Sequence, residues 1–188
     1  MKKLFVVLVA IVLVASFASA QNIWGQGKMS AGVGVELALP MGSVGDLYGI
    51  GIGGLGLFQY GLNEEILLTG QVGYTAFAEK TVGTAKYSMS DLIILAGGKY
   101  NLSKSVTEGF YGMLQLGIYS VSAKGTAPSY TIPGVGTFGG GTYTASSSEF
   151  VFAPGVGMQF GPIDASVKYI INSSVGNLAL NVLYVFPL

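Results

Sequence analysis

Five charged residues occupy positions where chemistry inside a fold is conceivable: Glu36, Asp91, Lys99, Glu149 and Lys168. Each lies in a segment that alternates apolar with small or polar side chains, and each falls on the less apolar face. A lone buried charge is costly, so we expect these carboxylates and ammonium groups to pair with one another as a structural cluster. The functional alternative is an ion path or gate lined by the same charges.

Catalysis has few candidates, because the sequence contains no His and no Cys. His is the most frequent general base and the usual activator of a nucleophile. His and Cys are also the common transition-metal ligands. A Ser–Lys arrangement remains formally open, but the spacing of these residues suggests none. We therefore predict no enzymatic activity, no metal and no cofactor.

Two glycine patterns match the spacing of a dinucleotide-binding loop: Gly49, Gly51 and Gly54, and then Gly134, Gly136 and Gly139. In such a loop the glycines follow a strand and open a helix. Neither pattern does so here, and a chain with 30 glycines is expected to match by chance. We interpret both as strand or loop glycines.

The N-terminus has the three parts of a secretory signal peptide. Lys2 and Lys3 precede an apolar run over 4–15, and Ala18-Ser19-Ala20 has the small-x-small form of a cleavage site. The apolar run is shorter than the roughly twenty residues that span a membrane. We predict a signal peptide at 1–20, cleaved after Ala20, and one domain at 21–188.

The remaining chain is hydrophobic without a spanning helix. Charged residues make up 10% of the sequence, against roughly 25% in soluble domains. Without Lys2 and Lys3, seven lysines stand beside nine acids, a formal charge of −2, so nucleic acid is excluded as a partner. A hydrophobic chain of this kind can span a bilayer if its β-sheet closes into a barrel, so that every backbone N–H and C=O group is hydrogen-bonded.

Eight segments show the period of two that is typical of strands with unlike faces. They cover 28–39, 49–60, 66–78, 89–102, 110–119, 149–160, 165–172 and 178–186. In the second segment Ile50 and Ile52 are out of phase with Leu55 and Leu57, which predicts a bulge at 53–54. An even strand number suits a single-chain bacterial barrel. The predicted fold is all-β: an eight-stranded antiparallel up-and-down transmembrane β-barrel.

The two faces could be arranged in either of two ways. A soluble lipid-binding cup of the lipocalin kind would turn the less apolar face to water, where many charges are expected. That face carries only about one charge per segment, among small residues that suit a narrow interior. Aromatic residues near segment ends resemble the girdles of membrane barrels. The membrane arrangement is favoured, and the soluble cup remains the alternative.

The longest connection runs over 123–148 and is rich in Gly, Ser and Thr. Because longer loops of such barrels face outward, we place the odd-numbered connections outside the cell. Residues 130–144 could form a projecting hairpin, and Tyr130, Phe138 and Tyr143 are the candidate contact residues. A loop without a ligand is the alternative.

The sequence resembles the small outer-membrane β-barrel family of the OmpA and OmpX type. The resemblance covers 28–188 and rests on pattern, most clearly on Phe152-Ala153-Pro154-Gly155-Val156-Gly157-Met158-Gln159-Phe160 and on the terminal strand. Family members usually end on an aromatic residue that the assembly machinery recognises, whereas this chain ends Phe186-Pro187-Leu188.

The resemblance and the pattern together imply a non-enzymatic barrel of the cell outer membrane with a structural or surface-contact role. Its lumen is expected to be plugged by the polar and charged core. The expected partners are outer-membrane lipid, the assembly machinery during insertion, and an extracellular surface met through 123–148. The barrel is expected to be a monomer. The alternatives are a small-solute channel and the soluble cup in the periplasm.

Overall fold

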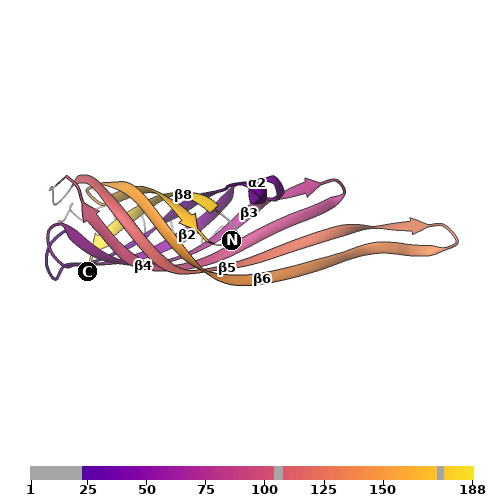
Figure 1. Cartoon of the computed structure of the whole chain (residues 1–188), viewed down its shortest axis with the longest axis horizontal. Coiled ribbons are helices and arrows are strands. Elements are labelled where there is room, and N and C mark those ends of the chain that lie inside the picture. The colour runs from indigo at the N-terminus through magenta and orange to yellow at the C-terminus, as the bar shows by residue number, and fades with distance from the viewer. Residues whose placement is uncertain (1–22, 104–107, 173–175) are drawn as a thin grey trace, which may run out of the picture.

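The computed structural model describes residues 23–103, 108–172 and 176–188. Eight antiparallel strands follow one another around a closed barrel, which confirms the predicted fold (Figure 1). Their bounds are β1 Met29–Pro40, β2 Gly51–Gly61, β3 Ile66–Val82, β4 Ala85–Asn101, β5 Glu108–Ile132, β6 Gly136–Phe160, β7 Ile163–Ile171 and β8 Gly176–Pro187. The predicted signal peptide and its cleavage site at Ala20 lie outside the described residues.

The barrel closes where β1 pairs with β8, from Ser30 opposite Pro187 to Pro40 opposite Asn177. Each strand is therefore hydrogen-bonded on both sides at the level of the barrel. This arrangement leaves no free strand edge there and satisfies the backbone without help from water.

A short helix, α2 (Ser43–Leu47), lies in the connection between β1 and β2, which the sequence predicted only as a loop. No helix in the described part of the chain is long and apolar enough to cross a membrane.

The predicted bulge in β2 is wrong. The strand pairs with β1 and β3 without a break, from Gly51 to Tyr60. Leu55 and Leu57 are buried in the interior, whereas Ile52 is 68% exposed on the outer face. The apolar residues change faces along a regular strand. Glycine occupies the outward positions 54 and 56, and leucine occupies the inward positions 55 and 57.

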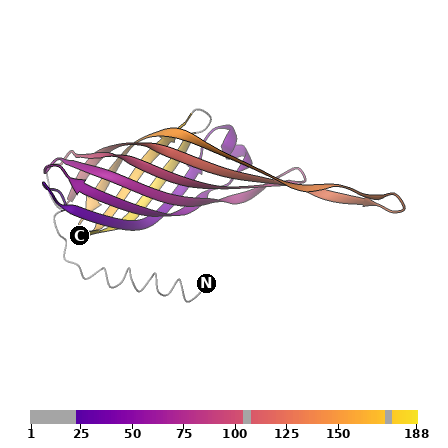
Figure 2. The same ribbon diagram turned by 90° about the horizontal axis from the view of Figure 1, so that it is seen from below.

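Two connections between the predicted strand segments consist largely of paired strand. Between the predicted segments 66–78 and 89–102, the chain forms longer strands joined by a turn at Gly83-Thr84 between β3 and β4, with a register shift between Phe77 and Lys80. The long connection at 123–148 is mostly a two-stranded extension of β5 and β6, paired from Ser120–Ser148 to Ile132–Gly136, so the hairpin considered for residues 130–144 is present. This β5–β6 hairpin projects well beyond the barrel (Figures 1 and 2).

The two faces of the barrel carry different side chains, in the phase that the sequence predicted. Apolar residues such as Val35, Val72, Ile94, Ile118 and Val156 are exposed on the outside. The residues that alternate with them are buried inside.

The two ends of the barrel also differ. One end, which we call the turn end, carries the short turns at 62–65 and 161–162 and the C-terminus. The other, the hairpin end, carries α2 and the tips of the β3–β4 and β5–β6 hairpins (Figure 1).

Candidate functional site

Near the turn end, a buried ion pair joins two strands that are not neighbours in the ring. Lys99 of β4 contacts the Asp164 carboxylate of β7 through its ammonium group. The Tyr111 hydroxyl donates a hydrogen bond to the other Asp164 oxygen at 2.5 Å. The Lys99 ammonium also lies 4.4 Å from the centroid of the Tyr111 ring. Both oxygens of this carboxylate are therefore engaged, as a buried charge requires.

Nearer the hairpin end, a second ion pair joins β7 to β1. The Lys168 ammonium lies 3.5 Å from one Glu36 oxygen. The Thr75 hydroxyl donates to the other Glu36 oxygen at 3.0 Å. Both charged side chains are almost completely buried.

Asp91 belongs to the same level of the interior. The Tyr119 hydroxyl donates to an Asp91 oxygen at 2.6 Å, and the Asn177 amide donates to the Tyr119 oxygen at 2.7 Å. This chain of contacts links β4, β5 and β8. Four of the five charges singled out in the sequence, Glu36, Asp91, Lys99 and Lys168, are thus buried in the interior and joined across it.

Glu149 is placed differently from these four. It is only half-buried and stands opposite Tyr119 in the β5–β6 ladder, where the barrel passes into the hairpin.

Asp164 is the interior charge that sequence reasoning missed. It stands at the start of β7, next to the turn at 161–162, and the predicted strand began one residue later. The signal was available, because Asp164 alternates in phase with Ser166 and Lys168.

Apolar side chains fill the interior between and beyond the ion pairs. One cluster near the turn end includes Trp24, Leu57, Tyr111 and Leu183. A second includes Ile93, Leu95, Tyr119, Val151 and Ile170. A third, near the hairpin end, includes Ala38, Phe77 and Met89.

The described residues contain no group of three or more acidic side chains placed to hold a metal ion. The two glycine patterns lie in strands and connections, in agreement with their interpretation from the sequence: Gly49 precedes β2, which contains Gly51 and Gly54, and Gly134 precedes β6, which contains Gly136 and Gly139.

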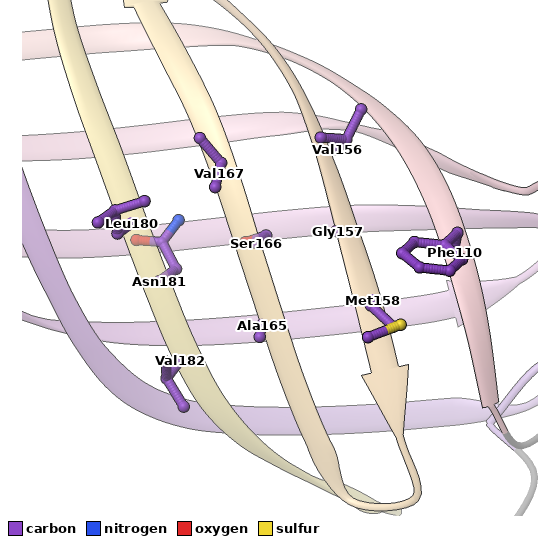
Figure 3. Close-up of a pocket in the computed structure, with 10 residues that line it drawn as sticks. All are labelled: Phe110, Val156, Gly157, Met158, Ala165, Ser166, Val167, Leu180, Asn181 and Val182. Atoms are coloured by element: carbon purple, nitrogen blue, oxygen red, sulfur yellow. The ribbon is translucent and has the colours of Figure 1, made fainter.

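A shallow groove marks the outer wall of the barrel across β5, β6, β7 and β8 (Figure 3). It arises because the small Ala165 lies in one cross-strand row with Phe110, Met158 and Val182. Only apolar side chains face outward in this row, so the groove offers a surface for hydrocarbon and no reactive group.

The candidate contact residues lie in the β5–β6 hairpin. Tyr143 is 75% exposed. Tyr130 and Phe138 are paired with each other across the hairpin by their backbones, and their side chains lie outside the described part of the structure.

No known family model and no curated protein matches the sequence. Solved structures do match. Ail, the attachment invasion locus protein of Yersinia pestis, is 19% identical with a TM-score of 0.59, over 86% of this chain and 99% of Ail. Ail in complex with the heparin analogue sucrose octasulfate is 17% identical with a TM-score of 0.52, over 86% and 99% of the two chains.

A third similar structure is Neisserial surface protein A, which is 16% identical with a TM-score of 0.48, over 84% of this chain and 95% of that one. At such low identities the similarity concerns the fold rather than an activity. The eight-stranded closed ring, its apolar outer face and its likeness to Ail together show that the chain has the fold of the small outer-membrane β-barrels of the OmpA and OmpX type.

Proposed function

We propose that the chain spans the outer membrane as a non-enzymatic, non-conducting barrel that holds the β5–β6 hairpin outside the cell for surface contact. The observation that carries this proposal is the division of the barrel into an apolar outer face and an interior that is packed with side chains and crossed by two buried ion pairs.

The outer face supports a membrane location. Large apolar side chains are exposed around the whole ring, including Ile52, Val72, Ile94, Leu116 and Val182. Monomeric soluble proteins rarely expose apolar surface on this scale. A soluble lipid-binding cup would have the opposite arrangement, with its apolar side chains lining the cavity.

The interior supports a barrel that does not conduct. An eight-stranded barrel is just wide enough for side chains to fill it. Here the Lys99–Asp164 and Lys168–Glu36 pairs cross the space that a solute would need. Opening a path would separate buried opposite charges, which is strongly unfavourable.

The hairpin supports a role in contact. Beyond Thr126, strand β5 has no pairing to β4, and before Phe152, strand β6 has none to β7 in the described part of the chain. Their outer edges therefore offer free main-chain groups, which recruit extended partners. Ail, which shares the fold, is an attachment invasion locus protein; for this chain the argument rests on its own hairpin.

The proposed partners follow from the same features. The outer face would contact lipid, and the assembly machinery would insert the chain. A monomer suffices, because the closed ring leaves no edge to be covered within the membrane.

Conductance in a planar bilayer tests the central claim. The purified, processed chain, refolded in detergent and inserted into the bilayer, is expected to give no steady current. A steady, reproducible current would instead establish the small-solute channel. A processed chain that stays monodisperse in buffer without detergent would establish the soluble cup.

A further inference from the structure

A groove lined by tyrosines lies at the hairpin end, where the β3–β4 and β5–β6 extensions leave the barrel. It encloses about 450 Å³, and three tyrosines line it: Tyr48, Tyr87 and Tyr143. Between them lies a floor of small residues, which comprises Ala85, Ala123, Gly125, Ala127 and Ala145. We call this the tyrosine groove.

The strands place these residues on one face. Gly125 of β5 stands between Tyr87 of β4 and Tyr143 of β6 in the ladders. A Cβ atom added to Gly125 would lie 3.5 Å from the Tyr87 ring, so this ring leans over the glycine. Because side chains alternate along a strand, this face continues the inner face of the barrel.

The third tyrosine comes from the connection that contains α2. Tyr48 packs on the apolar cluster of Ala38, Phe77 and Met89, which closes the interior beneath the groove. The neighbouring backbone is tied to β3, since Gly49 donates to the Ala78 carbonyl at 3.0 Å. Burial and the nearby Tyr87 phenol raise the pKa of the Tyr48 hydroxyl.

In the described part of the chain, two of the lysines near the groove are engaged by other groups. The Lys80 ammonium donates to the Gly45 carbonyl at 2.6 Å. Lys86 pairs with Glu79 at 3.2 Å. Lys124 also lines the groove. Because it is adjacent to Gly125 in β5, the alternation of the strand directs its side chain to the opposite face of the sheet.

We propose that the tyrosine groove binds a short, uncharged oligosaccharide presented from outside the cell. A pyranose ring has apolar C–H faces and a rim of hydroxyls. Tyrosine offers the complementary pair, an apolar ring face and a hydroxyl that donates and accepts. The volume falls within the range of ordinary small-ligand sites.

The backbone argues against an extended peptide as the occupant. The strands under the groove are continuously paired, from Lys86–Thr126 to Lys124–Ser88 on one side and Thr126–Thr142 to Lys124–Thr144 on the other. A peptide laid on this floor would gain no main-chain hydrogen bonds from it, which is the usual source of strand-addition affinity.

The position of the groove argues for a ligand from outside. Its face continues the inner face of the barrel, so the groove lies at the mouth of the barrel at the hairpin end. The inference therefore rests on the proposed function for the placement of this end outside the cell.

Saturation-transfer-difference NMR tests the groove with the full processed chain in detergent micelles. The probes are maltotriose and triacetylchitotriose, with a proline-rich hexapeptide as the comparison ligand. At least one trisaccharide is expected to receive saturation on its C–H protons. Tyr143→Ala should weaken its binding about tenfold, through loss of one aromatic contact.

Further variants test whether a loss of saccharide binding is specific to the tyrosine groove. Gly125→Leu should abolish binding, because the added side chain fills the floor, whereas Tyr143→Phe should retain most of it. The matched control is Tyr100→Ala, which removes an exposed tyrosine near the turn end. Heat-modified migration in gels checks that each variant is folded.

Three results would overturn the inference: no transfer to either trisaccharide, transfer that is unchanged by both Tyr143→Ala and Gly125→Leu, or binding of the hexapeptide alone. If the barrel neither conducts nor binds a saccharide, the proposed function stands, and only the inference that the tyrosine groove binds an oligosaccharide is rejected.

Discussion

The interior charges are arranged so that one strand serves both ion pairs. Asp164 and Lys168 lie four residues apart on β7, and each finds its partner on a different strand, Lys99 on β4 and Glu36 on β1. Removing either member of a pair leaves its partner as an unpaired charge in the interior of the barrel. The free energy at stake is therefore larger for removing one member than for removing a whole pair.

Lys168→Ala is expected to destabilise the barrel by about 3–5 kcal/mol, because it leaves the buried Glu36 carboxylate without its cation. Urea or heat unfolding in detergent measures the change.

The double variant Glu36→Gln with Lys168→Met is the control, since it removes both charges and keeps similar volumes. It should recover most of the lost stability. Unchanged resistance of Lys168→Ala to unfolding would show that the pair contributes little.

Among the elements, β1 and β8 approach closely where the barrel closes. A Cβ atom added to Gly34 of β1 would lie 2.2 Å from the Val182 carbonyl oxygen of β8, far inside contact distance. Backbone cannot move aside as a flexible side chain can, so the closing seam depends on glycine at this position.

Gly34→Ala is expected to lower the free energy of unfolding by about 1–3 kcal/mol, as overpacking does. Gly70→Ala is the matched control, because a Cβ there meets nothing within 4 Å on the outer face of β3. The same unfolding assay compares them, and equal stability of the two variants would contradict the argument.

The β5–β6 hairpin should be separable from the barrel. In the part of the chain that the structure describes, the residues between Ala127 and Gly141 pair with each other and with no other strand. Replacing 128–140, which include Tyr130 and Phe138, by an Asn-Gly turn is therefore expected to leave the unfolding midpoint unchanged while it weakens contact with cells or surfaces. A folded, truncated barrel that still adheres like the wild type would disprove the role of the hairpin in contact.

For the molecule as a whole, the two ends should lie on opposite sides of the membrane. The chain has no Cys, so a single introduced thiol reports its own location. Val135 lies in the tip of the β5–β6 hairpin, and Asn63 lies in the turn between β2 and β3.

On intact cells, a membrane-impermeant maleimide is expected to label Val135→Cys and to spare Asn63→Cys. Lysis should make both reactive, which controls for intrinsic accessibility. Labelling of Asn63→Cys alone on intact cells would invert the proposed orientation.

Much of this architecture can be predicted from the sequence. Alternation placed the inward and outward residues of β1, β3, β4 and β6 in the observed phase, because a strand turns successive side chains to opposite faces. Alternation failed in β2, because Ile52 points outward whereas Leu55 and Leu57 point inward in the same regular strand. It also underestimated β5 and β6, because Gly, Ser and Thr are as common in loops as in an exposed paired ribbon.

The contacts of side chains across the barrel follow from the closure of the ring and from the stagger between its strands, rather than from the local sequence pattern. Lys99 and Asp164 are 65 positions apart, and their contact exists because β4 and β7 face each other across a narrow ring. The tyrosine groove likewise needs a connection and two hairpins to converge at one end. Local pattern defines strands and faces since it acts between neighbours in the chain, whereas contacts across the interior depend on how all eight strands are assembled.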